Sequence, residues 1–188
     1  MIVAGFDLGG KNNFGWCVLR ANPFDVALDR NDVAVGTAEH AIAARDAVVA
    51  ELGGEVALEA AAIDAPLFWQ PAGQEIDREV HALHLNSLRG GCLVQGLLVG
   101  RELKATFPRL RLTEVYPRWL ADQIESNPTI RKNLQNLHAH ERDAFLAVLA
   151  AWAMIEGRKG WRNRIPVDNN EVWMPIGERE YWLPSNLA

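Results

Sequence analysis

The sequence predicts an α/β domain with a mixed five-stranded sheet, three antiparallel strands followed by parallel ones, flanked by helices. Two short apolar runs, at residues 2–7 and 14–19, are separated by a polar turn and predict a β-hairpin. Long helical stretches separate the later apolar runs, near residues 58–64 and 110–115, which permits a parallel return of the chain. The 188 residues, 49% of them hydrophobic, suffice for one domain with a substantial core.

The first half of the chain continues with a third antiparallel strand over residues 32–36. Thr37 then offers an N-cap for a helix that ends near the glycine pair at residues 53–54. The run at residues 58–64 has few polar residues, as is typical of a central strand covered on both faces. Pro66 ends that strand, because proline lacks the amide hydrogen that a sheet ladder needs.

The second half begins with two predicted helices, over about residues 76–86 and 92–106, which form the crossover. Residues 110–115 are the last predicted strand. Residues 117–124 follow as a short helix, since proline suits the first turn. Residues 125–139 are expected to form a loop or a short helical insert.

The strongest predicted helix covers residues 143–156. Its side chains are apolar around most of the circumference, so it should lie against a sheet with Asp143 as a charge in its first turn. Beyond Gly157 the composition changes to Trp, Asn, Arg and Pro, and the tryptophans include Trp161, Trp173 and Trp182. The expected organisation is a domain over residues 1–156 and a Trp-rich C-terminal arm, residues 157–188, packed on that domain.

The charge and cysteine content restrict the possible partners and location. With a formal net charge of -5, any contact with nucleic acid must come from a local basic patch. The two cysteines, Cys17 and Cys92, lack C-x-x-C spacing and are expected to be buried free thiols. No window reaches the roughly 20 apolar residues that a membrane span needs. We therefore expect a cytoplasmic protein, and its oligomeric state stays open.

Four carboxylates each end or open a predicted element: Asp7, Asp64, Glu114 and Asp143. The first three end strands, so the arrangement can gather them at one edge of the sheet. Such a cluster repels itself unless a cation lies among it, which favours a site for hard divalent ions with oxygen ligands. Metal-assisted phosphodiester chemistry is the matching reaction class. Considered one at a time, each acid has a simpler explanation. It can be a solvated residue at a strand end, or a negative charge stabilised near a helix N-terminus.

The order of strands and helices, with acids at these positions, resembles the ribonuclease-H-like fold. Five segments are similar to the family known as domain of unknown function 429, whose members are predicted nucleases. They are Gly5-Phe6-Asp7, Ile63-Asp64-Ala65-Pro66, Asp77-Arg78-Glu79, Thr113-Glu114-Val115-Tyr116-Pro117 and Arg142-Asp143-Ala144-Phe145. The resemblance covers residues 2–156. One turn departs from it, because Gly9-Gly10-Lys11-Asn12 replaces the Gly-Cys-x-x-Gly-Trp turn of many members.

This resemblance implies a metal-dependent nuclease that uses Mg²⁺ or Mn²⁺. It makes Asp7, Asp64, Glu114 and Asp143 both the metal ligands and the catalytic residues, with Asp7 bridging two ions. Nucleic acid is the implied substrate, and the choice between DNA and RNA stays open.

Several residues are candidates for substrate binding: Lys11, His140, Arg158, Lys159 and Arg162. Lys11 follows two glycines in a strand turn, although the P-loop spacing is absent. The basic residues after position 157, together with Arg164, can bind a phosphate backbone, and Trp161 between them can stack on a base. Equally, their positive charges can complement the carboxyl end of the preceding helix. His138 and His140 are expected just before the last helix, within reach of the acids or simply exposed.

Five further polar residues lie in the first helix of the predicted crossover. Asp77-Arg78-Glu79 suits surface charges as well as a site. His81 and His84 share a helix face at a spacing that can hold a soft metal ion. No further Cys or His completes a tetrahedral set of ligands, so we prefer a solvated or helix-capping role for both.

Two other functions compete with the nuclease interpretation. Phe6-Asp7-Leu8-Gly9-Gly10-Lys11 also resembles the first phosphate loop of actin-like and sugar-kinase-like phosphotransferases. Those enzymes have two related domains, which 188 residues barely accommodate. The third possibility is a catalytically silent scaffold that binds a protein partner through its Trp-rich tail.

Overall fold

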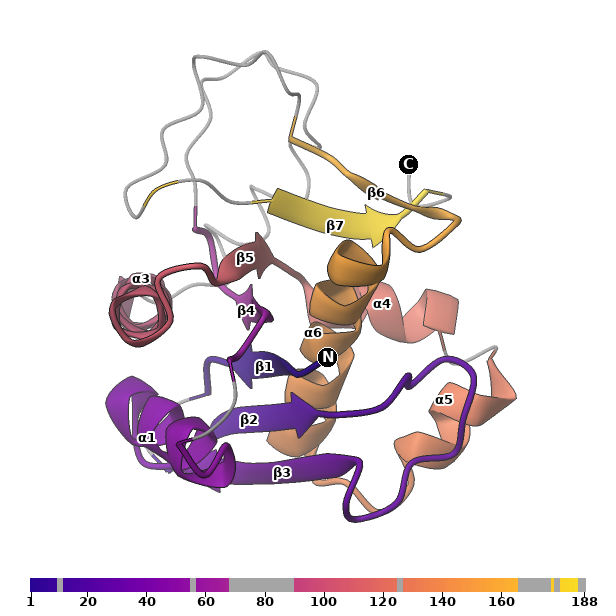
Figure 1. Cartoon of the computed structure of the whole chain (residues 1–188), viewed down its shortest axis with the longest axis horizontal. Helices are drawn as coiled ribbons and strands as arrows, with labels where there is room; N and C mark the ends of the chain where they lie inside the picture. The colour runs from indigo at the N-terminus through magenta and orange to yellow at the C-terminus, as the bar shows by residue number, and fades with distance from the viewer. Residues whose placement is uncertain are drawn as a thin grey trace.

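The computed structural model describes residues 1–9, 12–54, 57–67, 90–124, 127–165, 177 and 180–185. Its centre is a mixed sheet with the strand order β3-β2-β1-β4-β5-β7-β6 (Figure 1). The first three strands, β1 (Val3–Asp7), β2 (Phe14–Leu19) and β3 (Val33–Ala38), pair antiparallel. β4 (Ala60–Asp64) and β5 (Arg111–Glu114) run parallel to β1. The predicted α/β class and the antiparallel-then-parallel pattern are confirmed.

The predicted number of strands is wrong, because the described residues already form a sheet of seven strands instead of five. β7 (Glu180–Pro184) pairs parallel with β5, and β6 (Trp161–Asn163) pairs antiparallel with β7. Residues 161–163 and 180–184, which belong to the segment expected to pack on the domain as an arm, therefore extend the sheet. The added strands satisfy the backbone groups at the edge of β5. β6 has only three residues, and β7 begins with an acid and ends in proline, so neither resembles the apolar runs from which the other strands were predicted.

Helices cover both faces of the sheet. α1 (Ala41–Glu51) and α3 (Gly90–Thr106) lie side by side on one face (Figure 1). α6 (Ala139–Glu156) crosses the opposite face, with α4 (Pro117–Ile124) and α5 (Pro128–Asn133) beside it. The core is accordingly split into two apolar clusters by the sheet. This arrangement explains why β1 and β4 are almost wholly buried, and for β4 it agrees with the central position predicted from its sequence.

Two predicted helix starts are wrong. β3 continues through Ala38, so His40, and not Thr37, caps α1 by accepting the backbone N–H of Ala43. α6 begins at Ala139, four residues earlier than expected. Its first turn is stabilised because the Glu141 carboxylate accepts the backbone N–H of His138 at 3.0 Å.

The remaining elements agree with the sequence or lie beyond the described residues. α4 covers residues 117–124, as predicted, and α5 is the short helical insert expected within residues 125–139. Cys17 is a buried free thiol. The helix predicted over residues 76–86 lies outside the described part of the chain. In the residues that are described, no helix has both the length and the apolar character to cross a bilayer.

Candidate functional site

Three of the four predicted acids meet where parallel strands end. Asp7 ends β1 and is paired in register with Asp64 at the end of β4. Glu114 ends β5, beside Ile63 of β4. Asp7 is 7% exposed and Glu114 is fully buried. Because the carboxyl ends of neighbouring parallel strands share one edge of a sheet, the fold concentrates negative charge there.

Helix α6 brings the fourth acid, Asp143, to the same edge. The helix lies directly on the strand backbones, since a Cβ added to Gly5 would overlap the carbonyl oxygen of Ala144 and lie 2.5 Å from the backbone nitrogen of Val148. A Cβ on Gly15 would overlap the carbonyl oxygen of His140. Two glycines thus allow the first turns of α6 to approach β1 and β2 closely.

The pKa directions show that these acids lie within electrostatic reach of one another. Burial, followed by the charges of Asp7, Asp143 and Glu114, raises the pKa of Asp64 well above its usual value. Burial also raises the pKa of Asp7, and the charge of Asp143 adds to that effect. The pKa of Asp143 is raised by burial as well. Ionising the whole cluster therefore costs free energy in the folded protein.

His140 lies against the cluster from α6. Its Nδ1 is 2.5 Å from Oδ2 of Asp7, and this hydrogen bond partly opposes the increase in the pKa of Asp7. The side chain of His140 is 37% exposed, whereas that of Asp7 is 9% exposed. His140 precedes Asp143 by three residues, so both side chains share one side of the helix. We expected His140 just before the helix, and it is instead the second residue of α6.

Glu114 also holds the chain that leaves the neighbouring strand. Its Oε2 accepts the backbone N–H of Leu67 at 2.8 Å. Helix α3 packs closely on the same region, because a Cβ on Gly96 would overlap the Cβ of Ala65 and lie 3.1 Å from Cδ1 of Leu8. The strand ends that carry the acids are thus fixed by side-chain and helix contacts.

Comparisons of the chain with protein-family models, with curated proteins and with solved structures found no match. The interpretation of the site therefore depends on its own geometry and chemistry. Among the residues that the structure describes, no three or more His, Cys, Asp and Glu side chains are arranged to hold a metal ion as they stand. What favours a cation is the chemistry of the donor set, four carboxylates whose mutual repulsion a positive ion would relieve.

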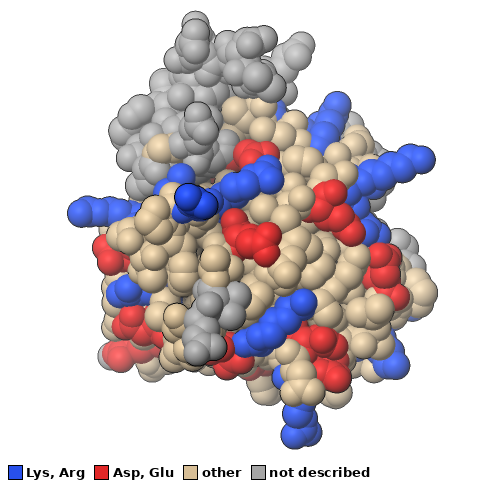
Figure 2. Space-filling model, viewed as in Figure 1, with Lys and Arg blue, Asp and Glu red and all other residues tan. Residues whose placement is uncertain are grey.

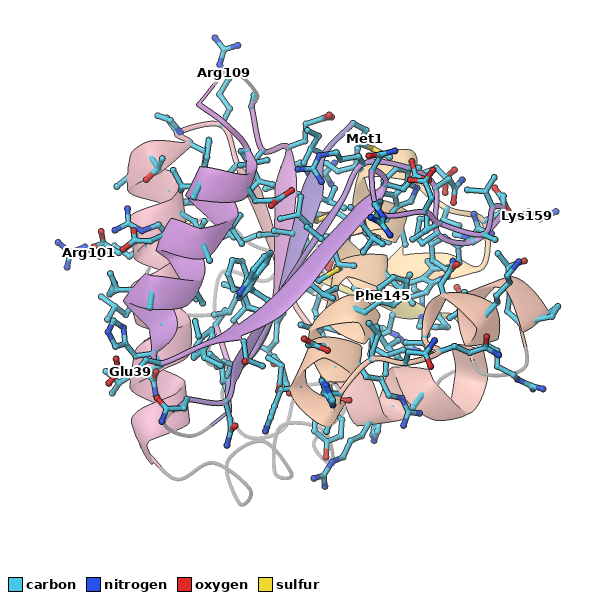
Figure 3. All side chains as sticks on the ribbon, turned by 90° about the horizontal axis from the view of Figure 1, so that it is seen from below. Met1, Glu39, Arg101, Arg109, Phe145 and Lys159 are labelled. Carbon is cyan, nitrogen blue, oxygen red and sulfur yellow. The ribbon has the colours of Figure 1, made fainter. Side chains whose placement is uncertain are left out.

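The basic residues predicted after α6 lie away from the acids. Asp143 and Glu156 are thirteen residues apart on α6, about 20 Å along its axis. Lys159 is correspondingly distant from Phe145, the residue two positions after Asp143 (Figure 3). The side chain of Arg158 is engaged locally, with an ion pair to Glu156 at 3.1 Å and its guanidinium 3.8 Å from the ring centre of Phe24.

Consequently, Arg158 and Lys159 are not brought to the acid cluster, and Arg162 lies on β6, opposite Leu183 of β7. Lys11, His81, His84 and the Asp77-Arg78-Glu79 segment lie outside the described residues. Two arginines that the sequence analysis did not select act on Asp143 instead: Arg142 and Arg118 both lower its pKa. The sequence alone shows that Arg142 is next to Asp143. Arg118 comes near Asp143 only because α4 packs beside α6.

Proposed function

We propose that the protein is a divalent-metal-dependent nuclease that hydrolyses phosphodiester bonds, with a ribonuclease-H-like architecture and a relationship to the domain of unknown function 429 family. The strand order β3-β2-β1-β4-β5, antiparallel for the first three strands and parallel afterwards, supports the architecture. The observation that carries the function is the convergence of Asp7, Asp64 and Glu114 at the ends of three neighbouring parallel strands. Asp143 lies close enough for its charge to act on Asp64 as well.

The four acids suit Mg²⁺ or Mn²⁺, since both ions accept carboxylate oxygens. Asp7, Asp64, Glu114 and Asp143 would hold the metal, and its positive charge would favour the ionised form of Asp64 against the burial and the repulsion that together raise the pKa of that residue. When bound, divalent ions in such sites activate water and stabilise the leaving oxygen of a phosphodiester.

The residues around the acids have supporting roles in this proposal. His140 orients the carboxylate of Asp7, and the Leu67 backbone fixes that of Glu114. Arg118 and Arg142 add positive charge on the Asp143 side, where they suit a phosphate of the substrate. Basic and acidic side chains are interspersed over the face seen in Figure 2, so a local contact of this kind accords with the net charge of -5.

Thermal melting separates this function from its rivals. A ligand that binds only the folded state stabilises it by about 2.7 kcal/mol at a hundredfold excess over Kd. For a chain of this size that corresponds to a rise in Tm of roughly 5–11 °C. We expect Mn²⁺ or Mg²⁺ alone to raise Tm relative to EDTA, and the Asp7→Asn and Asp64→Asn variants to lose this increase. Asp46→Asn, which changes an exposed acid on α1, is the matched control and should keep it.

The alternatives give different results in the same experiment. Stabilisation only by ATP together with Mg²⁺ would indicate a phosphotransferase, because kinase sites hold the metal largely through the nucleotide. No stabilisation by either ligand would indicate a scaffold.

Cleavage of single- and double-stranded DNA and RNA then tests the reaction itself. Asp64→Asn should reduce the rate of metal-dependent cleavage by about two orders of magnitude or more. This is roughly the loss that follows when a strong contact to the transition state is removed. Undiminished cleavage by this variant would refute the nuclease assignment.

A further inference from the structure

The two edges of the sheet differ in how they are protected. An exposed edge strand offers unpaired backbone N–H and C=O groups to any other strand, so proteins usually shorten such strands or place charges and prolines on them. Strand β6 follows this rule, because it has three residues and carries Arg162 at its centre. Strand β3, at the other edge, has six residues, Val-Ala-Val-Gly-Thr-Ala, with no charge and no proline. Of the two edges of the described sheet, only the one at β3 lacks this protection.

The ladder to β2 determines which backbone groups of β3 point outward. All six residues of β3 pair with β2 in a continuous antiparallel register without a bulge. Just before the strand, the backbone N–H of Arg20 donates to the carbonyl group of Asp32 at 2.8 Å, so this residue pair is hydrogen bonded. Hydrogen-bonded and non-hydrogen-bonded pairs alternate along an antiparallel ladder. Every second residue from Ala34 therefore bonds to β2, whereas the backbone groups of Val35 and Thr37 point away from it.

These outward groups have no further strand beside them in the described part of the chain. β3 is the last strand in the sheet order, and no described helix or strand lies beyond it at the lower edge of the sheet in Figure 1. The amide of Val33 is used locally, since it donates to the carbonyl group of Asp29 at 3.2 Å. The open part of the edge is thus the stretch around Val35 and Thr37.

We infer that the edge of β3 binds β3 of a second copy of this chain, so that two sheets join across a two-fold axis. Antiparallel pairing of a strand with itself opposes donors to acceptors, because Val35 and Thr37 each present one N–H and one C=O group. This inference concerns assembly and is independent of the proposed nuclease function.

The side chains of β3 also match a second copy. Outward-bonding residues of the two strands must lie opposite each other, and opposite residues share a face of the sheet. Val33 and Val35, which are only partly buried against the α6 side of the core, would therefore meet the same valines of the other copy. The opposite face of β3 presents only alanine and glycine, which leave room for the join. A foreign strand would need a charge or a large side chain to select it, and β3 offers neither.

Sedimentation equilibrium over a wide range of protein concentration tests this assembly. We expect wild type to change from one chain, 20.9 kDa, to twice that mass as concentration rises. Thr37→Pro leaves the ladder to β2 intact, because the N–H that it removes points outward. It deletes one donor from each copy, so the dissociation constant of the dimer should rise by at least about a hundredfold. Thr37→Lys keeps the N–H and adds a charge to the edge, and it should also weaken the dimer.

Val94→Lys is the matched control. Val94 is 63% exposed on α3, so the substitution adds a charge to an apolar surface away from β3 and should leave the dimer unchanged. Far-UV circular dichroism checks that each variant is folded, and Thr37→Lys decides the question if Thr37→Pro does not fold. Wild type that stays monomeric, a dimer that persists in the folded Thr37 variants, or a dimer broken only by Val94→Lys would overturn the inference.

Residue-resolved amide hydrogen exchange gives a direct readout within the same strand. The amides of Ala34 and Gly36 bond to β2 and should exchange slowly at every protein concentration. Those of Val35 and Thr37 should exchange rapidly in dilute solution and slow down as the dimer forms. A dimer in which Val35 and Thr37 still exchange rapidly would show that another surface holds the two copies together.

Discussion

Replacing Gly5 with alanine should both destabilise the protein and separate the two halves of the acid cluster. The new methyl group would lie 2.5 Å from the backbone nitrogen of Val148, whereas ordinary contacts begin at 3.4 Å. Helix α6 must therefore move away from β1 by at least about 0.9 Å at this point, because the carbonyl oxygen of Ala144 lies closer still. Because the obstacle is a helix backbone and not a flexible side chain, the strain cannot be relieved by rotating a side chain.

Overpacking of this kind typically costs about 1–3 kcal/mol. For a chain of this length, the expected fall in Tm is roughly 2–12 °C. The displacement also carries Asp143 and His140 away from Asp7, so the increase in Tm caused by Mn²⁺ should shrink as well. Urea denaturation measures the free energy of unfolding, and melts with Mn²⁺ and with EDTA measure the effect of the metal.

Gly53→Ala is the control for this experiment. Gly53 has a φ of 64° with nothing within 4 Å of an added Cβ, so the substitution costs backbone strain without moving α6. It should lower Tm but leave the Mn²⁺ effect intact. If Gly5→Ala keeps wild-type stability, or loses stability while keeping the full Mn²⁺ effect, the close packing of α6 does not assemble the site.

Two further predictions concern charge. The metal-free protein should become less stable as pH rises above about 4, because the pKa values of Asp7, Asp64 and Asp143 are raised above the usual 3.8 and the folded state then binds more protons than the unfolded state until these groups ionise. In EDTA, Asp64→Asn should show a shallower decline in the free energy of unfolding, and an equally steep decline would contradict this assignment. Arg158→Ala should reduce stability by about 0.5–1 kcal/mol through loss of its contact with the Phe24 ring. It should leave the salt dependence of nucleic-acid binding unchanged, and a flatter salt slope would show that the end of α6 contacts phosphates after all.

Local patterns in the sequence were enough to identify most elements. The apolar runs that become β1, β2 and β4 are recognisable because a buried strand needs several consecutive apolar residues. Pro117 marked the start of α4 correctly, since proline suits the first helical turn. These features depend on neighbours in the chain, which is why the sequence by itself determined them.

The strand ends Asp7, Asp64 and Glu114 were visible in the same way, as acids that terminate apolar runs. Their selection from the sequence required no knowledge of strand pairing. That Asp7 and Asp64 are opposite each other depends on the register between β1 and β4, which the sequence did not specify.

Only the tertiary structure decided which distant groups join these acids. The hydrogen bond between His140 and Asp7 depends on how α6 packs on the sheet, where Gly15 allows a close approach. The approach of Arg118 depends on how α4 packs beside α6. The separation of Arg158 from the acids follows from the length of α6. The formation of β7 likewise depends on pairing with the edge of β5, although the two strands are far apart in the sequence. Such contacts join segments far apart in the chain, so local residue patterns carry little information about them.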